Sequence, residues 1–176
     1  MKRRLRRASL EIQRASWDFM TNSLAASTVV PPEIRRVLLR RLGLSLGDCR
    51  IKPRVFFGSR EIEIGDGTFI NYGVFMDGSA PISIGQNSSI AYEVMFATSS
   101  HDIGESSSRS GAHRPQPIAV GNGVWVGARA TILGGVSIAD GCLIAAGSLV
   151  TADCAADGLY AGAPARRVRD LPTGKA

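Results

Sequence analysis

Aliphatic side chains recur every six residues in the second half of the chain. The clearest register runs through Val120, Val126, Ile132, Ile138, Ile144 and Val150. Four positions after the first five of these comes a small or medium-sized residue, namely Val124, Ala130, Val136, Cys142 and Ser148. A period of six matches neither the α-helix nor simple strand alternation. It instead predicts a unit of one short strand and one turn, in which the aliphatic residue points inwards and the small residue occupies the corner.

Two shorter registers extend this pattern towards the N-terminus. One contains Ile64, Ile70 and Met76, and the other, offset by two residues, contains Ile84, Ile90 and Phe96. Stacked units of this kind bury a continuous core that no single unit could bury alone. The pattern therefore predicts a β-solenoid that begins at about residue 46.

The preceding residues follow a different pattern, which favours helices. Apolar residues at helical spacing predict an amphipathic helix over residues 8–24, and Pro31 and Pro32 interrupt that spacing. A second helix is predicted over residues 32–42, with Gly43 just beyond its end. We expect its apolar face to contain Ile34, Val37, Leu38 and Leu42, with most of its arginines on the opposite face.

The six-residue repeat stops over residues 97–117. Within this segment the run "SSSRSGAHRPQP" is polar and rich in Ser and Pro, which predicts a loop that leaves the solenoid. Long loops in compact domains are often functional. The break therefore marks the surroundings of His101, one of only two histidines, as a candidate functional site.

The formal net charge of +6 is concentrated at one end of the chain. Residues 1–41 carry a balance of +7, which leaves −1 for the rest. A basic face can meet nucleic acid, anionic lipid or a phosphorylated ligand. No nucleic-acid motif accompanies this one, so we expect a solvated helix face and no nucleic-acid partner. Weak peripheral contact with a membrane through this segment is the alternative interpretation.

The compartment is predicted from the apolar segments and the cysteines. No run of about 18 apolar residues and no signal-peptide core is present, which predicts a cytoplasmic protein without a transmembrane helix. The three cysteines are far apart and form neither a zinc motif nor a disulfide framework. We therefore expect buried, reduced thiols at Cys49, Cys142 and Cys154.

Four segments carry a resemblance to a known family. They are "INYGVFMDG" (70–78), "TSSHDIG" (98–104), "PIAVGNGVWVGARATILGGVSIADGCLIAAGSLVTADC" (117–154) and "YAGAPARRVR" (160–169). The chain resembles the hexapeptide-repeat acyltransferases, and most of all their galactoside, maltose, nodulation-factor, polysaccharide and streptogramin acetyltransferase branch. The resemblance covers roughly residues 45–170. It implies an all-β, left-handed parallel β-helix with three repeats per coil, an N-terminal α-helical segment, an extruded loop and a homotrimer.

The resemblance also suggests a division of the chain into three parts. Residues 1–45 form a basic helical cap segment. Residues 46–156 form the left-handed β-helix, from which the loop 97–117 is extruded. Residues 157–176 form a C-terminal tail that contacts CoA.

The resemblance supplies candidate catalytic and acceptor residues. His101 matches the family's catalytic histidine, and a neutral imidazole suits removal of a hydroxyl proton at neutral pH. Asn71 matches an acceptor-site asparagine that binds the acceptor or helps to position the histidine, and Asp77 matches an acidic residue that binds acceptor hydroxyls. Where the family usually has proline after the histidine, this chain has Asp102. That carboxylate either reflects a different acceptor or orients the imidazole.

Candidate donor-binding residues follow from the same resemblance. Trp125 matches the tryptophan that lines the groove for the pantetheine arm, and Ala128 and Ala146 match corners whose backbone binds that arm. Thr151 matches a contact to the adenine end. Two basic positions near the nucleotide phosphates correspond to Arg166 and Arg169, and Arg167 could share their task. The family often has a lysine where this chain has Ala152, so one cationic contact is missing.

The implied reaction is acetyl transfer from acetyl-CoA to a hydroxyl of a saccharide, glycoside or related small acceptor, with His101 as general base between subunits. The alternatives are an antibiotic acetyltransferase and a non-catalytic solenoid that binds or scaffolds a partner. A zinc enzyme of the gamma-class carbonic anhydrase type needs three histidines. The chain contains only His101 and His113, so we expect no metal.

Overall fold

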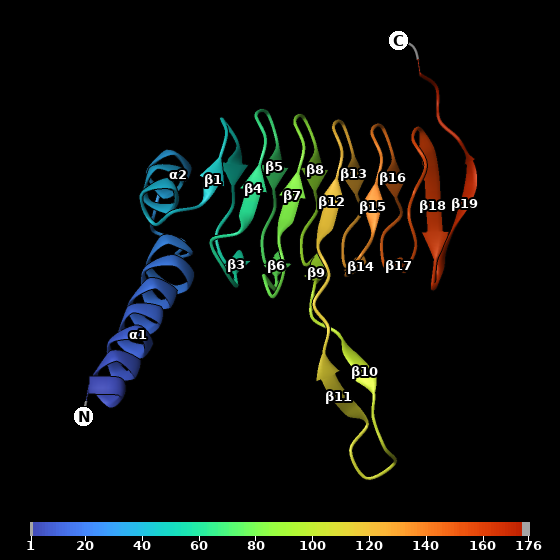
Figure 1. The fold of residues 1–176 in the computed structure, drawn as a ribbon. Helices are drawn as coiled ribbons and strands as arrows, with labels where there is room; N and C mark the ends of the chain where they lie inside the picture. Colours follow the sequence, from blue (N-terminus) through green and yellow to red (C-terminus); the bar gives the residue numbers. More distant parts are fainter. Residues whose placement is uncertain (1, 174–176) are drawn as a thin grey trace.

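A three-sided solenoid forms the body of the molecule. The computed structural model describes residues 2–173, and its short strands pair in parallel into three sheets of about six turns. In Figure 1 the chain rises along the front sheet and descends behind it while advancing from left to right. A coil with this sense is left-handed, so the fold is the left-handed parallel β-helix that the family resemblance implies.

Each sheet takes one parallel strand from successive coils, except that the last two strands of sheet B pair antiparallel at the C-terminal end. Sheet A contains β1 (Ser45–Leu46), β4 (Ile62–Ile64), β7 (Ile82–Ile84), β12 (Ile118–Val120) and β15 (Ser137–Ile138). Sheet B contains β2 (Arg50–Ile51), β5 (Phe69–Ile70), β8 (Ser89–Ile90), β13 (Trp125–Val126), β16 (Leu143–Ile144), β18 (Gly158–Gly162) and β19 (Ala165–Asp170). Sheet C contains β3 (Phe56–Phe57), β6 (Phe75–Met76), β9 (Met95–Ala97), β14 (Thr131–Leu133) and β17 (Leu149–Val150).

The register of these sheets explains the period of six. Val126 pairs with Ile144, and Ile132 pairs with Val150, so one coil takes 18 residues or three units. All aliphatic and small positions of the three predicted registers are buried. The inward side chains thus stack on the same position of the next coil, and the predicted core is confirmed.

The corner between sheets C and A holds the departures from the repeat. The offset of two residues between Met76 and Ile84 falls there, in residues 77–81. One coil later the predicted loop leaves the same corner between β9 and β12. It contains an antiparallel hairpin of β10 (His101–Ile103) and β11 (Ser110–His113), which projects well beyond the solenoid (Figure 1). The extruded loop is therefore confirmed, and it is an ordered hairpin.

The second predicted helix is present, but only part of its predicted apolar face is buried: Leu38 packs against the core, and Leu42 is half-buried. The helix α2 (Pro32–Arg41) lies across the first coil. Ile34 and Val37 are 55% and 47% exposed, whereas Arg35 and Leu39 are buried. The physical reason is that the chain around the first coil presents unpaired backbone carbonyls, and a guanidinium satisfies them better than an aliphatic side chain.

Arg35 makes four hydrogen bonds to these carbonyls. Its Nε donates to the carbonyl of Ala25 at 2.7 Å, and Nη1 donates to that of Ile51 at 2.8 Å. Its Nη2 donates to the carbonyls of Ser27 and Val30, both at 2.7 Å. Burial lowers the pKa of this guanidinium. One side chain thus joins the linker before α2 to the first coil.

The first predicted helix differs in its limits and its geometry. α1 (Lys2–Asp18) begins earlier than residue 8, and after it the π-helix η1 (Phe19–Ala25) continues the chain. Trp17 packs against the core and donates from Nε1 to the carbonyl of Leu42 at 2.9 Å, while Leu10 and Leu24 stay exposed. No helix within residues 2–173 is both long and apolar enough to cross a membrane.

The three cysteines are free and buried, as predicted. Burial raises the pKa of each thiol, and that of Cys154 rises to about 12. Cys142 and Cys154 lie in consecutive coils, where the Cys142 thiol donates to the carbonyl of Ala155 at 3.2 Å. These thiols therefore belong to the core.

Candidate active site

The edge between sheets B and C brings together predicted residues from three coils. The inward residues Ile70, Ile90, Val126 and Ile144 are register partners, so the residues that follow them stack along one line. Asn71 lies in the N-terminal half of this line, and Ala128 and Ala146 lie further along it. The backbone N–H of Gly147 donates to the carbonyl of Ala128 at 2.8 Å. We call this line the B–C edge; in each coil it comprises the three residues after the sheet-B strand.

Trp125 lies on the outer face of sheet B beside this edge. It is exposed, and its partners in the neighbouring strands are Ser89 and Leu143. Ala128 follows it by three residues on the same coil. The structure therefore places an exposed indole next to two alanine corners, and a narrow chain can approach the backbone there because alanine side chains are small.

His101 begins β10 on the hairpin and is exposed. Its Nδ1 lies 3.0 Å from the carbonyl oxygen of Gly111. A carbonyl only accepts hydrogen bonds, so Nδ1 carries the proton and the Nε2 of the neutral ring keeps a free lone pair. This arrangement leaves Nε2 able to accept a proton from a substrate.

His113 lies directly across the hairpin from His101, although the sequence indicated only a loop residue. The two histidines are register partners, and their ring centroids are 5.2 Å apart. His113 Nε2 lies 3.1 Å from the hydroxyl of Ser99 at the root of the hairpin. The pairing depends on the hairpin register, and nothing in the polar sequence indicates which residues of the two strands face each other.

Asp77 hydrogen-bonds the residues at the base of the hairpin to the preceding coil. Its carboxylate accepts hydrogen bonds from the backbone N–H of Ser99 at 2.5 Å, the hydroxyl of Thr98 at 3.1 Å and the hydroxyl of Ser79 at 2.9 Å. Thr98 is buried. Whatever else Asp77 does, it holds the point from which the His101 strand leaves the solenoid.

Asp102 does not orient the imidazole. Its carboxylate accepts from Arg114 Nε across the hairpin at 2.8 Å, and the imidazole of His101 is held by Gly111 instead. The side chains of residues 101 and 102 point to opposite faces of the strand, as strand geometry requires. The interpretation that Asp102 orients His101 is therefore wrong.

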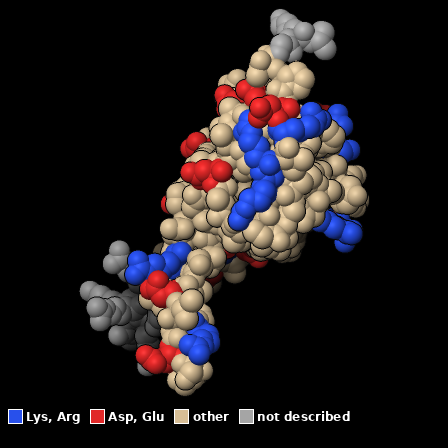
Figure 2. Space-filling model, turned by 90° about the vertical axis from the view of Figure 1, so that its right-hand side faces the viewer, with Lys and Arg blue, Asp and Glu red and all other residues tan. Residues whose placement is uncertain are grey.

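The C-terminal end of the solenoid carries the predicted phosphate-binding arginines. Figure 2 looks at this end, where basic side chains cross the face. Arg166 and Arg169 are exposed on β19, and Thr151 is exposed just after β17. Arg167 differs from its neighbours because it donates to the carbonyl of Ala155 at 2.9 Å and to several groups nearby. Its guanidinium is thus occupied in holding the last coil.

A single chain leaves these parts separated. His101 lies on the hairpin at the corner of sheets C and A, whereas Asn71 and Ala128 lie on the B–C edge. Within residues 2–173 no hydrogen bond joins His101 to Asn71 or to Asp77. Asn71 accepts a hydrogen bond at Oδ1 from the N–H of Tyr72 at 2.9 Å. Within one chain, therefore, His101 does not meet the residues of the edge between sheets B and C.

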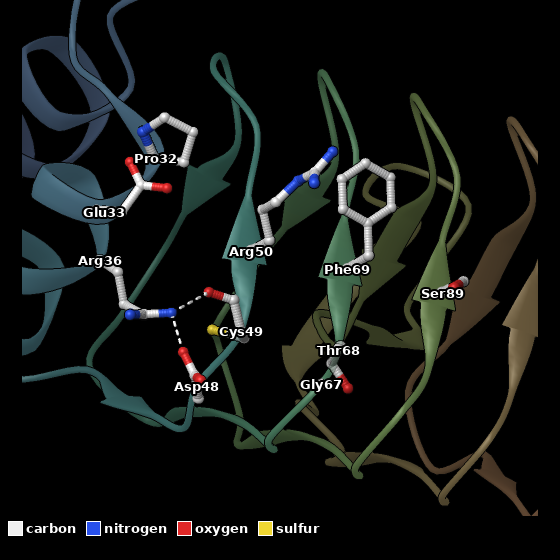
Figure 3. A pocket seen from close by; sticks show the side chains of 10 residues that line it. All are labelled: Pro32, Glu33, Arg36, Asp48, Cys49, Arg50, Gly67, Thr68, Phe69 and Ser89. Atoms are coloured by element: carbon white, nitrogen blue, oxygen red, sulfur yellow. Dashed lines mark hydrogen bonds and ion pairs between the residues drawn. The ribbon is translucent and has the colours of Figure 1, made fainter.

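A hollow of about 550 Å³ lies elsewhere, between α2 and the outer face of sheet B (Figure 3). Arg36 crosses it to pair with Asp48, and the side chains of Arg50 and Phe69 lie along its other wall. None of the predicted site residues lines it. Nor do the described residues contain a group of three or more His, Cys, Asp or Glu able to hold a metal ion.

The comparisons with known proteins agree on one family. Residues 117–152 match the family described as bacterial transferase hexapeptide (six repeats). The galactoside O-acetyltransferase of Escherichia coli (strain K12) is 30% identical over 141 residues, which cover 79% of this chain and 70% of that protein. The enzyme of the same name from Lactococcus lactis subsp. lactis is 27% identical over 150 residues, covering 82% and 72%.

Solved structures agree with these relatives. A hexapeptide-repeat-containing acetyltransferase from Vibrio cholerae superimposes with a TM-score of 0.81 at 32% identity, covering 93% of both chains. The Vibrio protein has also been solved with acetyl coenzyme A. A galactoside acetyltransferase in complex with coenzyme A superimposes with a TM-score of 0.79 at 27% identity, covering 92% of this chain and 80% of that one.

Proposed function

Because this chain belongs to the hexapeptide-repeat acetyltransferases, we propose that it transfers an acetyl group from acetyl-CoA to a hydroxyl of a saccharide, glycoside or related small acceptor. The observation that carries this proposal is the state of His101. Its Nδ1 proton is donated to the Gly111 carbonyl, which leaves Nε2 free to act as a base. The V. cholerae relative binds acetyl coenzyme A, which supports the donor.

In the proposed reaction His101 first accepts a proton and then donates the same proton. Nε2 accepts the proton of the acceptor hydroxyl while the hydroxyl oxygen bonds to the thioester carbonyl carbon. The C–S bond then breaks, and Nε2 returns the proton to the departing sulfur. The Gly111 carbonyl accepts the Nδ1 hydrogen bond throughout and so stabilises the transient imidazolium. The transfer is direct and needs no acyl-enzyme.

We assign the donor to the B–C edge. The pantetheine arm lies against Trp125 and the corners at Ala128 and Ala146, where small side chains permit close contact with the backbone. The adenine end lies near Thr151. The guanidinium groups of Arg166 and Arg169 on the C-terminal segment 157–176 face the phosphates, and their exposure leaves them open to this role. Arg167 has no part in it, because it already binds backbone carbonyls.

We assign Asn71 and Asp77 to the acceptor side. The amide of Asn71 lies on the same edge as the donor corners, two coils before Ala128. Asp77 keeps acceptor capacity beyond its three internal hydrogen bonds, because an ionised carboxylate offers about four lone-pair sites. Its firm hold on Ser99 also places the acceptor side and the His101 hairpin in a fixed relation.

We further propose a homotrimer in which sheet C faces the threefold axis. The outer face of sheet C is largely apolar and consists of Phe56, Phe75, Met95, Thr131 and Leu149. The outer face of sheet A is mostly polar and consists of Ser45, Glu63, Ser83, Ala119 and Ser137. With sheet C inward, the corner of sheets C and A in one subunit adjoins the B–C edge of the next. The His101 hairpin leaves from the first and the donor lies on the second.

The first experiment measures free-thiol release from acetyl-CoA across a panel of sugars, nucleotide sugars and hydroxylated antibiotics. We expect turnover with at least one acceptor, and His101→Ala should lower kcat by about 10²- to 10⁴-fold while leaving the oligomer intact in light scattering. An unchanged rate would remove His101 from the mechanism. If wild-type protein fails to bind acetyl-CoA in calorimetry, the non-catalytic solenoid becomes the better account. Turnover of antibiotics alone would favour the xenobiotic alternative.

A further inference from the structure

The B–C edge changes character halfway along the solenoid. At the second corner position its residues are Tyr72, Tyr92, Ala128 and Ala146 in successive coils. Their alignment follows from backbone hydrogen bonds, since the N–H of Glu93 donates to the Tyr72 carbonyl at 2.9 Å and that of Arg129 to the Tyr92 carbonyl at 3.1 Å. The tyrosines are 44% and 50% exposed. The C-terminal half thus carries small alanine side chains, and the N-terminal half carries exposed aromatic rings.

The boundary between the two halves lies at the level of the His101 hairpin. Tyr92 and β9 belong to the same coil, and the chain enters the hairpin directly after β9. In the proposed trimer the subunits rotate about an axis along the solenoid, and such a rotation leaves each coil at its own level. A neighbour's hairpin therefore reaches the B–C edge where the alanines end and the tyrosines begin. A donor lying over the alanines would present its thioester at this level.

The Lys52 side chain places a positive charge at the N-terminal end of the aromatic surface. Lys52 occupies the B–C edge one coil before Tyr72, and its Nζ lies 5.4 Å from the centre of the Tyr72 ring. Within the described residues Lys52 has no carboxylate partner. Arg129 on the same edge differs, because it pairs with Glu93 at 2.6 Å. Lys52 therefore holds an uncompensated positive charge next to a ring face.

We propose that Tyr72, Tyr92 and Lys52 form the acceptor subsite, and that the acceptor is a saccharide with an anionic group, either a carboxylate or a phosphate. This inference rests on the proposed function. The apolar C–H face of a pyranose packs on the tyrosine rings, as aromatic side chains do in small-molecule sites. The anion pairs with the Lys52 ammonium. The reacting hydroxyl then points towards Asn71 and the neighbour's His101.

The test compares three forms of one sugar as acceptors. The probes are a methyl glycoside, its uronic acid and its 6-phosphate, each in gluco and galacto configuration, assayed by thiol release and by calorimetry with CoA bound. We expect kcat/KM for the anionic forms to exceed that of the neutral form by about tenfold or more. The uronic acid and the phosphate distinguish the two sources of charge.

Lys52→Gln should remove most of this preference, mainly by raising KM for the anionic forms. The matched control is Arg50→Gln, because Arg50 also stacks on an aromatic ring of the next coil, that of Phe69 at 5.2 Å, but on sheet B away from the edge. Tyr92→Ala should raise KM for every sugar, and Tyr92→Phe should restore it because the ring returns. Arg50→Gln should keep the preference.

Three results would overturn the assignment. They are a neutral sugar that is accepted as well as its anionic forms, a preference that survives Lys52→Gln, and binding of CoA without binding of any anionic saccharide. In each case the donor and His101 still stand. Failure of the proposed function looks different, because acetyl-CoA itself would then not bind. Calorimetry with the donor alone separates the two failures.

Discussion

At the residue scale, Arg35 is a single charged side chain that hydrogen-bonds to the backbone at the N-terminal end of the solenoid. The first coil of a solenoid has no preceding coil to accept its hydrogen bonds or cover its core. Leu39 covers the core, and Arg35 supplies four N–H donors to backbone carbonyls, of which that of Ser27 also accepts from the N–H of Val30. No carboxylate accompanies it among the described residues, so its contribution comes from hydrogen bonds to neutral groups.

Arg35→Met should lower the free energy of unfolding by about 3 kcal/mol, because it leaves buried carbonyls without donors. Chemical denaturation at one fixed protein concentration measures this, since an oligomer's stability depends on concentration. Arg41→Met on the same helix is the control, and its exposed side chain predicts a change within about 0.5 kcal/mol. Similar losses in both variants would show that Arg35 has no special role.

Cys154 predicts a dependence of stability on alkaline pH. Burial raises the pKa of this thiol from 9.0 to about 12. Between these values the unfolded chain loses the proton and the folded chain keeps it, so the free energy of unfolding falls as pH rises from about 9 to about 12. Urea titrations at pH 8 and pH 10 should therefore show a smaller alkaline loss in Cys154→Ala than in wild type. Equal losses would mean that the thiol titrates normally in the folded state.

At the scale of elements, the hairpin is a strand pair that holds the imidazole of His101 in a defined orientation. Gly111 on β11 binds the Nδ1 of His101 on β10, and the Asp102–Arg114 ion pair links the same strands. Asp77 and Ser99 attach the pair to the solenoid. His101, the base that we propose, therefore lies on a hairpin that projects from its own coil but is fixed where it leaves the solenoid.

Asp77→Ala should lower kcat by about tenfold or more, because a loosened root misplaces His101 relative to the neighbour's edge, and small misplacements are costly. The control is Asp102→Asn, which breaks an exposed ion pair worth at most about 1 kcal/mol. Steady-state kinetics separates the two roles of Asp77. A rise in KM at constant kcat would mean that Asp77 binds the acceptor and that its hold on the hairpin is not needed for turnover.

The elements themselves were predicted to different degrees. Residues 32–42 carry a helix signal with a proline at the start and a glycine after the end, and α2 matches it within one residue. The predicted apolar face of α2 is buried only at Leu38 and Leu42, because an amphipathic pattern assumes that burial favours apolar side chains. At the end of a solenoid the unpaired carbonyls reverse that preference. The hairpin register was beyond prediction, since polar strands carry no hydrophobic alternation to set it.

At the scale of the whole molecule, the three faces of the solenoid are unequal. The apolar outer row of sheet C includes a stacked pair, Phe56 and Phe75, with ring centroids 4.6 Å apart. Exposed apolar rows of this kind usually mark interfaces. The face that we place at the threefold axis is also the one that brings the hairpin to the donor edge, so assembly and activity should be lost together.

Met95→Glu should dissociate the trimer and abolish acetyl transfer, because it places a charge in the centre of the apolar row. Ser83→Glu is the matched control, since Ser83 is the outward residue at the same level of sheet A. Sedimentation and thiol release, measured on the same samples, check both effects. An active monomer would contradict a site shared between subunits, and a trimer of Met95→Glu would exclude sheet C as the interface.

The sequence by itself determined the six-residue unit, the solenoid and its inward residues. Each six-residue unit buries its aliphatic side chain against the same position of the neighbouring coil, so the information is repeated locally in every unit. Only the tertiary structure decided which corners align, that Arg35 rather than Ile34 turns inwards, and that His113 and Gly111 meet His101. Each of these contacts occurs only once in the molecule, unlike the core contacts that every coil repeats. The six-residue repeat therefore carries no information about them. They depend on unpaired hydrogen-bonding groups that appear only when the coils are stacked.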